Sequence, residues 1–170
     1  MAAKSFMRLV SGKLKAIQAV VTSTGATNDG DIPALDSTGK LDITLMPVGV
    51  GADVETCEAG EALSAGNYVN FYDDLGVKKV RLADNTNGRD AHGFVKAAVT
   101  IGSPAIVYFE GSNNDFTGLT VGARQYLGVA GGIIDIPLVP VTDAGKIHQF
   151  LGVAVNSTSI NTDIDDCMSL

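Results

Sequence analysis

Turn-forming residues limit how long any regular element of this chain can be. From residue 52 onward, clusters of Gly, Asn, Asp and Ser interrupt the sequence about every ten residues. The runs between them are rich in β-branched and aromatic residues, which favour short strands. We predict strands at the following positions: 54–58, 67–72, 77–83, 92–99, 104–109, 124–129, 132–136 and 149–155.

The spacing of these strands indicates the fold class. Short strands joined by tight turns are typical of barrels, sandwiches and jelly rolls. We therefore expect an all-β protein whose residues 52–170 form a single barrel or jelly-roll-like body. The connecting turns are expected at 73–76, 84–88, 111–115, 131–132 and 143–145, and the segment 156–170 as a loop or a final edge strand.

The first part of the chain, residues 1–51, differs in composition and is predicted to be an extended N-terminal arm and interlocking ribbon. Partial alternation over 8–15 favours two short strands around a turn at Ser11-Gly12. The positions of Leu14, Ile17 and Val21 also fit one face of a helix, which is the alternative.

The ribbon, from about residue 25 to 51, contains too few apolar residues for a core of its own. Pro33 and Pro47 favour extended backbone before them, and residues 36–39 form a good turn sequence. Its apolar residues must pack against the body or against a neighbouring chain. We expect them to pack across chains in a trimer, and the candidates for that packing are Ile32, Leu35, Leu41, Leu45 and Met46.

Charge is distributed unevenly along the chain. The net charge is −7, which argues against broad nucleic-acid binding, because phosphate contacts need a basic face. Four basic residues nevertheless precede the first acidic residue, Asp29: Lys4, Arg8, Lys13 and Lys15. This pattern suggests an arm that docks on an acidic partner, and the alternative is a solvated N-terminus with a chance bias.

Residue patterns for catalysis or metal binding are weak. His92 and His148 lack a metal-ligand spacing and are expected to be structural. The loop 84–90 resembles a calcium loop but lacks its order of ligands, so an Asx turn is the better interpretation.

We expect no enzymatic activity, no metal and no cofactor. Cys57 and Cys167 are expected to be reduced thiols, as in a protein made in a bacterial cytoplasm. The apolar runs are too short to span a bilayer, so we expect no membrane partner.

Several segments together resemble a family of phage proteins. The pattern I-P-x-L-D-x-x-G-K-L-D over 32–42, followed by Met46-Pro47, is similar to one in head-fibre, decoration and tail-fibre proteins of tailed bacteriophages. The segment 8–15 precedes it. The body resembles those proteins over 63–70, 92–95, 118–123 and 149–154.

The resemblance implies a virion structural protein, namely a capsid decoration (cement) or head-fibre protein on the capsid exterior. Such a protein would form a homotrimer, bind the major capsid protein and stabilise contacts between its subunits, without a cofactor. We expect the arm to supply the capsid contacts, and the candidates are Lys4, Phe6, Arg8, Leu9, Val10, Lys13, Leu14, Lys15 and Ile17. The alternative is a tail-fibre or head-fibre adhesin that binds a host glycan through exposed tyrosines, for which the chain offers Tyr68, Tyr72, Tyr108 and Tyr126.

Overall fold

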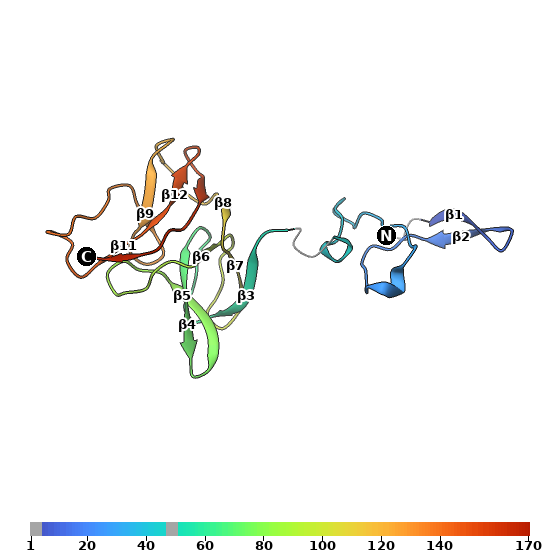
Figure 1. Ribbon diagram of the computed structural model, residues 1–170, viewed down its shortest axis with the longest axis horizontal. Helices are drawn as coiled ribbons and strands as arrows, with labels where there is room; N and C mark the ends of the chain where they lie inside the picture. The colour runs from blue at the N-terminus through green and yellow to red at the C-terminus, as the bar shows by residue number, and fades with distance from the viewer. Residues whose placement is uncertain (1–4, 47–50) are drawn as a thin grey trace. The chain divides into compact units, whose positions relative to one another are not determined.

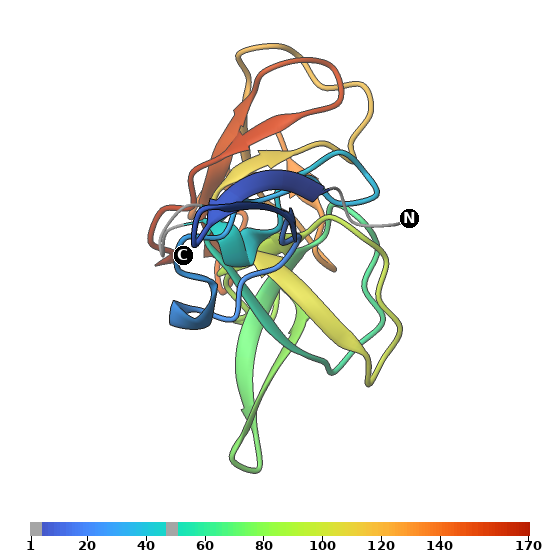
Figure 2. The same ribbon diagram turned by 90° about the vertical axis from the view of Figure 1, so that its right-hand side faces the viewer.

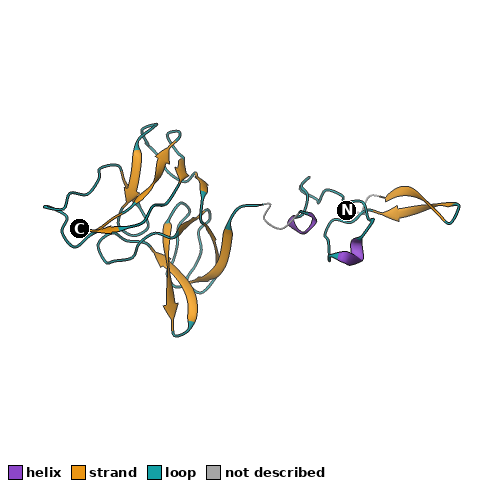
Figure 3. Ribbon diagram, viewed as in Figure 1, coloured by secondary structure: helices purple, strands orange, loops and turns teal. Residues whose placement is uncertain are grey.

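The computed structural model describes residues 5–46 and 51–170, and it divides into two compact units, residues 1–51 and 52–170 (Figure 1). Strands and loops make up nearly all of the described chain, with two short 3-10 helices in the first unit (Figure 3). The expectation of an all-β protein is therefore confirmed. None of the helices in the described ranges is long and apolar enough to cross a membrane.

The first unit begins with a β-hairpin of β1 (Ser5–Val10) and β2 (Lys13–Gln18). Its turn is formed by Ser11 and Gly12, with φ angles of 52° and 75°. Two successive positive φ angles define a type I′ turn, which matches the twist of paired strands. The predicted pair of strands around this turn is confirmed, and the helical alternative is wrong.

The ribbon that follows the hairpin contains η1 (Ala26–Asn28) and η2 (Ile43–Leu45). Val20 forms a parallel bridge with Pro33, because the Val20 N–H donates to the Ile32 carbonyl and the Ala34 N–H to the Val20 carbonyl. Asp42 caps η2 by accepting a hydrogen bond from the Thr44 N–H. Local polar contacts therefore shape the ribbon.

The second unit is built around a closed barrel of five strands in the order β3-β5-β4-β6-β7. Their bounds are β3 (Val54–Ala59), β4 (Tyr68–Asp74), β5 (Val77–Leu82), β6 (Gly93–Val95) and β7 (Pro104–Tyr108). Alternation fixes which side chains point inward: Ala105 and Val107 are buried, whereas Pro104 and Ile106 are exposed. The inward residues form a core with Val69, Val80 and Val95.

A five-stranded sheet in the order β10-β9-β12-β13-β8 completes most of the body. Its strands are β8 (Gly111–Asn113), β9 (Arg124–Leu127), β10 (Ile133–Ile134), β12 (Phe150–Ala154) and β13 (Ile160–Thr162), and a separate pair is formed by β11 (Ile147–His148) and β14 (Met168–Ser169). A second core includes Tyr68 and Phe94 from barrel strands and Leu127 and Leu151 from this sheet. The predicted barrel thus carries an additional sheet packed against it.

Buried polar side chains also join the barrel to the sheet. The Gln149 side chain accepts from the Ala91 N–H at 2.7 Å and donates to the Ala91 and Asp165 carbonyls, both at 3.0 Å. The Tyr68 hydroxyl lies 3.0 Å from the Thr162 hydroxyl, and burial raises the pKa of Tyr68 to about 12. Such contacts fix the two layers in one register, because a buried polar group left without a partner is costly.

The hairpin of β4 and β5 extends away from the sheet that contains β12, as the two views in Figures 1 and 2 agree. Leu75 and Gly76 form its turn, with φ angles of 55° and 87°. Lys79 on β5 pairs with Glu58 on β3 at 2.9 Å and with Asp74 on β4 at 2.8 Å. These hydrogen bonds raise the Lys79 pKa above its usual value.

The strand predictions succeed where apolar residues alternate and fail where they do not. The predicted turn at 111–115 is wrong, because β8 occupies Gly111–Asn113 and pairs with β13. The predicted strand 92–99 is shortened to β6, and β11, β13 and β14 were not predicted individually. The Asx turn at 84–90 is confirmed, since Asp84 Oδ1 accepts from the Thr86 N–H at 2.8 Å.

Candidate functional site

The β1–β2 hairpin sorts its side chains onto two faces. Residues directly opposite one another in an antiparallel pair share a face, and successive residues alternate between the two faces. The register pairs Phe6 with Ile17, Arg8 with Lys15 and Val10 with Lys13 on one face. The other face carries Ser5 with Gln18, Met7 with Ala16 and Leu9 with Leu14.

The first of these is the basic face, defined by Arg8, Lys13 and Lys15. Arg8 and Lys15 lie directly opposite each other, an arrangement of like charges that destabilises an isolated hairpin. Phe6 and Ile17 on this face are half-buried. The Arg8 guanidinium also donates to the Gly30 carbonyl at 3.4 Å, so the ribbon of the same unit contacts this face.

The second is the apolar face, defined by Met7, Leu9 and Leu14. Their exposed fractions are 62%, 66% and 69%. None of the three belongs to a buried cluster within the described residues. Exposed apolar side chains gathered on one face make it a candidate contact surface.

The candidates for capsid contact therefore do not form one surface. The structure places Phe6, Arg8, Val10, Lys13, Lys15 and Ile17 on the basic face and Leu9 and Leu14 on the opposite face. Their contact with the capsid stays a prediction, and one flat surface cannot meet all of them at once, because neighbouring residues of a strand point in opposite directions. Lys4 lies outside the described residues. Met7 was missed by the sequence analysis, although its alternation with Leu9 was a usable signal.

The candidates for packing across chains lie in the ribbon, and most of them are exposed. Ile32, Leu35, Leu41 and Met46 are exposed and Leu45 is half-buried. Ile43 in η2 is exposed too and extends the same set. No residue of the described segment 5–46 is buried. The apolar side chains of this unit consequently lack a core of their own within residues 5–46.

The Asp36 turn holds part of the ribbon in shape. Asp36 Oδ1 accepts from the Thr38 N–H at 2.7 Å, from the Thr38 hydroxyl at 2.7 Å and from the Lys40 N–H at 3.0 Å. The bond from the Lys40 backbone, followed by those from Thr38, lowers the pKa of Asp36 below its usual value. This turn lies within the segment whose sequence resembles phage fibre proteins.

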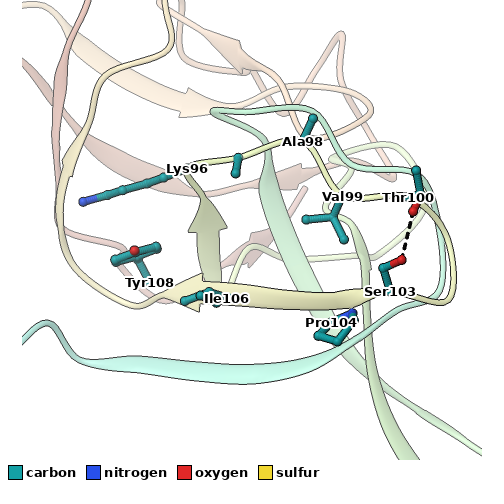
Figure 4. A pocket seen from close by; sticks show the side chains of 9 residues that line it. Lys96, Ala98, Val99, Thr100, Ser103, Pro104, Ile106 and Tyr108 are labelled. Atoms are coloured by element: carbon teal, nitrogen blue, oxygen red, sulfur yellow. Dashed lines mark hydrogen bonds between the residues drawn. The ribbon is translucent and has the colours of Figure 1, made fainter. Parts of the chain in front are cut away.

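A pocket of about 360 Å³ lies on the body beside β7. Figure 4 shows Lys96 and Tyr108 at one end and Thr100 and Ser103 at the other, with Ile106 between them. The Lys96 ammonium lies 4.3 Å from the Tyr108 ring centroid, within range of a cation–π contact. The combination of hydroxyls, one ammonium and apolar atoms suits a neutral or acidic polar ligand.

The expected tyrosine groove is only partly available. Tyr68 and Tyr126 are buried in the body, so the expectation that either contacts a ligand is wrong. Tyr72 and Tyr108 are half-exposed, and each has a cation over its ring. Tyr108 is the tyrosine that lines the pocket of Figure 4.

Asp90, His92 and Cys167 lie together on a second concave part of the body, with a volume of about 550 Å³. The Phe71 N–H donates to His92 Nδ1 at 2.9 Å, so the neutral ring carries its proton on Nε2 and donates it to Asp90 Oδ2 at 3.1 Å. Burial and the nearby Asp90 carboxylate raise the pKa of the Cys167 thiol. Within residues 5–46 and 51–170, no group of three His, Cys, Asp or Glu residues is placed to hold a metal ion.

Comparisons with known proteins include a distant structural likeness. No protein-family model and no curated protein matches the sequence. Among solved structures, the chain is similar to the N base of the head fibre gp8.5 in bacteriophage phi29, with a TM-score of 0.46 and 12% sequence identity. The match covers 66% of this chain and 95% of that chain. A TM-score this low does not establish a shared fold, so no residue of this chain takes a role from that protein.

Proposed function

We propose that this chain is a virion structural protein of a tailed bacteriophage that binds the outside of the capsid as a homotrimer. In this role it stabilises contacts between major capsid protein subunits. The observation that carries the proposal is a first unit with no buried residue in segment 5–46 and eight large apolar side chains exposed. Such a segment gains a core only by packing on a surface outside its own unit, and in an assembly component neighbouring chains supply that surface.

The sequence pattern over 32–42 supports the choice of a virion protein among assembly components. That pattern belongs to the part of the chain that lacks its own core, and its Asp36 turn is built from local hydrogen bonds. A trimer that contacts several capsid subunits multiplies weak contacts through effective concentration. Tight binding then requires no single large interface.

The basic face supplies the electrostatic part of the proposed capsid contact. Arg8, Lys13 and Lys15 gather on it, and an opposing acidic surface would relieve the repulsion between Arg8 and Lys15. We expect the double variant Arg8→Glu, Lys13→Glu to bind stripped capsids at least about tenfold more weakly than the natural chain at low salt. We expect raised salt to weaken binding of the natural chain.

A matched control changes the same charge elsewhere. Lys78 and Arg124 are exposed and lie outside the basic face, so the variant Lys78→Glu, Arg124→Glu alters the net charge equally. It should bind capsids as the natural chain does. Equal losses in both double variants would show that net charge, and not the basic face, governs binding.

The proposal assigns the chain no catalytic role and no cofactor.

The pocket beside β7 favours a second candidate, an adhesin module that binds a host glycan. Its hydroxyls and its half-exposed Tyr108 suit a sugar. A glycan array with the natural chain and with a Tyr108→Ala variant tests this candidate. Binding that is lost in the variant would support an adhesin, and no binding to any glycan would remove it.

A further inference from the structure

We propose that the two faces of the β1–β2 hairpin take different partners, and that the apolar face packs against the same face of other copies of this chain. The exposed cations of the basic face, Arg8, Lys13 and Lys15, then remain available to an acidic surface. This inference rests on the proposed function, since it assigns one partner to each face of the arm. It replaces the single contact surface expected from the sequence.

The apolar face is not covered by the unit to which it belongs. The ribbon contacts the opposite face, where Arg8 bonds to the Gly30 carbonyl and Phe6 and Ile17 are half-buried. Met7, Leu9 and Leu14 are about two-thirds exposed, although they are the most apolar side chains of their face. A partner from outside the unit is therefore needed to remove them from water.

The placement of the charges favours a second copy as that partner over contact through the basic faces. Within the hairpin, every charged residue of β1 and β2 lies on the basic face, and the apolar face has only Ser5 and Gln18 as polar residues. When copies pack apolar face to apolar face, their cations point outward and away from one another. Packing through the basic faces would instead bring like charges into contact and would be strongly unfavourable.

The hairpin face is one part of a larger contact between copies. It contributes six side chains, whereas stable interfaces use about 20–30 residues on each side. The exposed apolar residues of the ribbon supply further area, and they include Leu35, Leu41 and Ile43. A change on the hairpin alone need not dissociate a trimer, so the test has to detect the local contact.

Cysteine cross-linking detects that contact with neighbouring residues as matched controls. Leu14 and Lys15 are adjacent and exposed but lie on opposite faces, as do Leu9 and Arg8. Each is changed to cysteine in a full chain that carries Cys167→Ser, because Cys167 is exposed, while Cys57 is buried and its thiol pKa is raised. The variants are oxidised and also treated with a short bismaleimide, and linked chains are counted on denaturing gels.

We expect about tenfold more linked chains for Leu14→Cys than for Lys15→Cys, and for Leu9→Cys than for Arg8→Cys, because a disulfide requires Cα atoms within about 7 Å. The controls are strict because the cysteines on the basic face lie among cations, where a thiol is more reactive. Reactivity alone would therefore favour linking through the basic face. A trimer by light scattering in which no apolar-face cysteine links, or in which both faces link equally, overturns the face assignment alone. A natural chain that is monomeric overturns the proposed function as well.

Discussion

At the scale of single residues, Leu75 has a backbone conformation that its side chain disfavours. Its φ is 55°, and its side chain is 99% exposed at the tip of the β4–β5 hairpin. A left-handed conformation costs a branched, non-glycine residue about 1–2 kcal/mol. Nothing in the body repays that cost, because the exposed side chain packs on almost nothing.

Leu75→Asn is predicted to stabilise the body by about 1 kcal/mol, because Asn-Gly is the favoured type I′ turn. Denaturant unfolding of the natural and changed chains measures the difference. Leu75→Ala is the control, since it removes the same apolar surface but keeps the backbone strain. A gain in the alanine variant as large as in the asparagine variant would contradict the strain argument.

The Asp36 turn is predicted to loosen in acid. Its folded pKa is lowered, so its stabilising effect is present above the unfolded pKa of about 3.9 and is lost as the pH falls through the folded value. Amide hydrogen exchange at Lys40 should therefore accelerate in acid beyond its intrinsic pH dependence. The Asp36→Asn variant keeps a hydrogen-bond acceptor but cannot titrate. Amide exchange at Lys40 in this variant should therefore follow its intrinsic pH dependence alone.

At the scale of elements, strands β12 and β13 approach each other too closely for a side chain at Gly152. A Cβ there would lie 2.2 Å from the Asn161 carbonyl oxygen, and the φ of Gly152 is 150°. The register of β12 with β9 also shifts between Phe150 and Gly152. Glycine is therefore required where the strand bends.

Gly152→Ala is predicted to destabilise the body by about 3 kcal/mol through steric overlap and backbone strain. Thermal unfolding compares it with Gly102→Ala, where φ is 79° but no heavy atom lies within 4 Å of the added Cβ. The second variant should lose only about 1 kcal/mol, the cost of the φ angle. Equal losses would show that crowding between the strands is unimportant.

The side chain of Gln149 connects separate segments of the body through hydrogen bonds. Gln149→Leu leaves the N–H and the carbonyl of Ala91 without this partner in a buried place, so a loss of about 3 kcal/mol in denaturant unfolding is predicted. Thr117→Leu at an exposed position of the same unit is the control and should change stability by less than about 0.5 kcal/mol.

Sequence patterns could predict those elements that alternate between buried and exposed residues. β7 is one example, with Ala105 and Val107 inward. β8 could not be predicted this way, because Gly111, Ser112 and Asn113 resemble a turn and become a strand only by pairing with β13. The two faces of the hairpin could have been derived, since a two-residue turn at Ser11-Gly12 fixes the register.

At the scale of the whole molecule, the chain combines a slightly basic arm unit with a strongly acidic body. Residues 1–51 contain five basic and four acidic residues, whereas residues 52–170 contain seven and fifteen. An acidic body keeps copies apart in solution unless apolar contacts in the first unit hold them together. This distribution agrees with an arm that does the binding and a body that stays exposed to solvent.

Light scattering of the purified chain, alone and mixed with capsids stripped of decoration, measures both trimer formation and capsid binding. We expect a mass of three chains and saturable binding to the capsids. Added salt should leave the mass unchanged and weaken the binding. A monomer would contradict the packing of the first unit across chains. A trimer that does not bind capsids at any salt concentration would contradict the role in the virion shell.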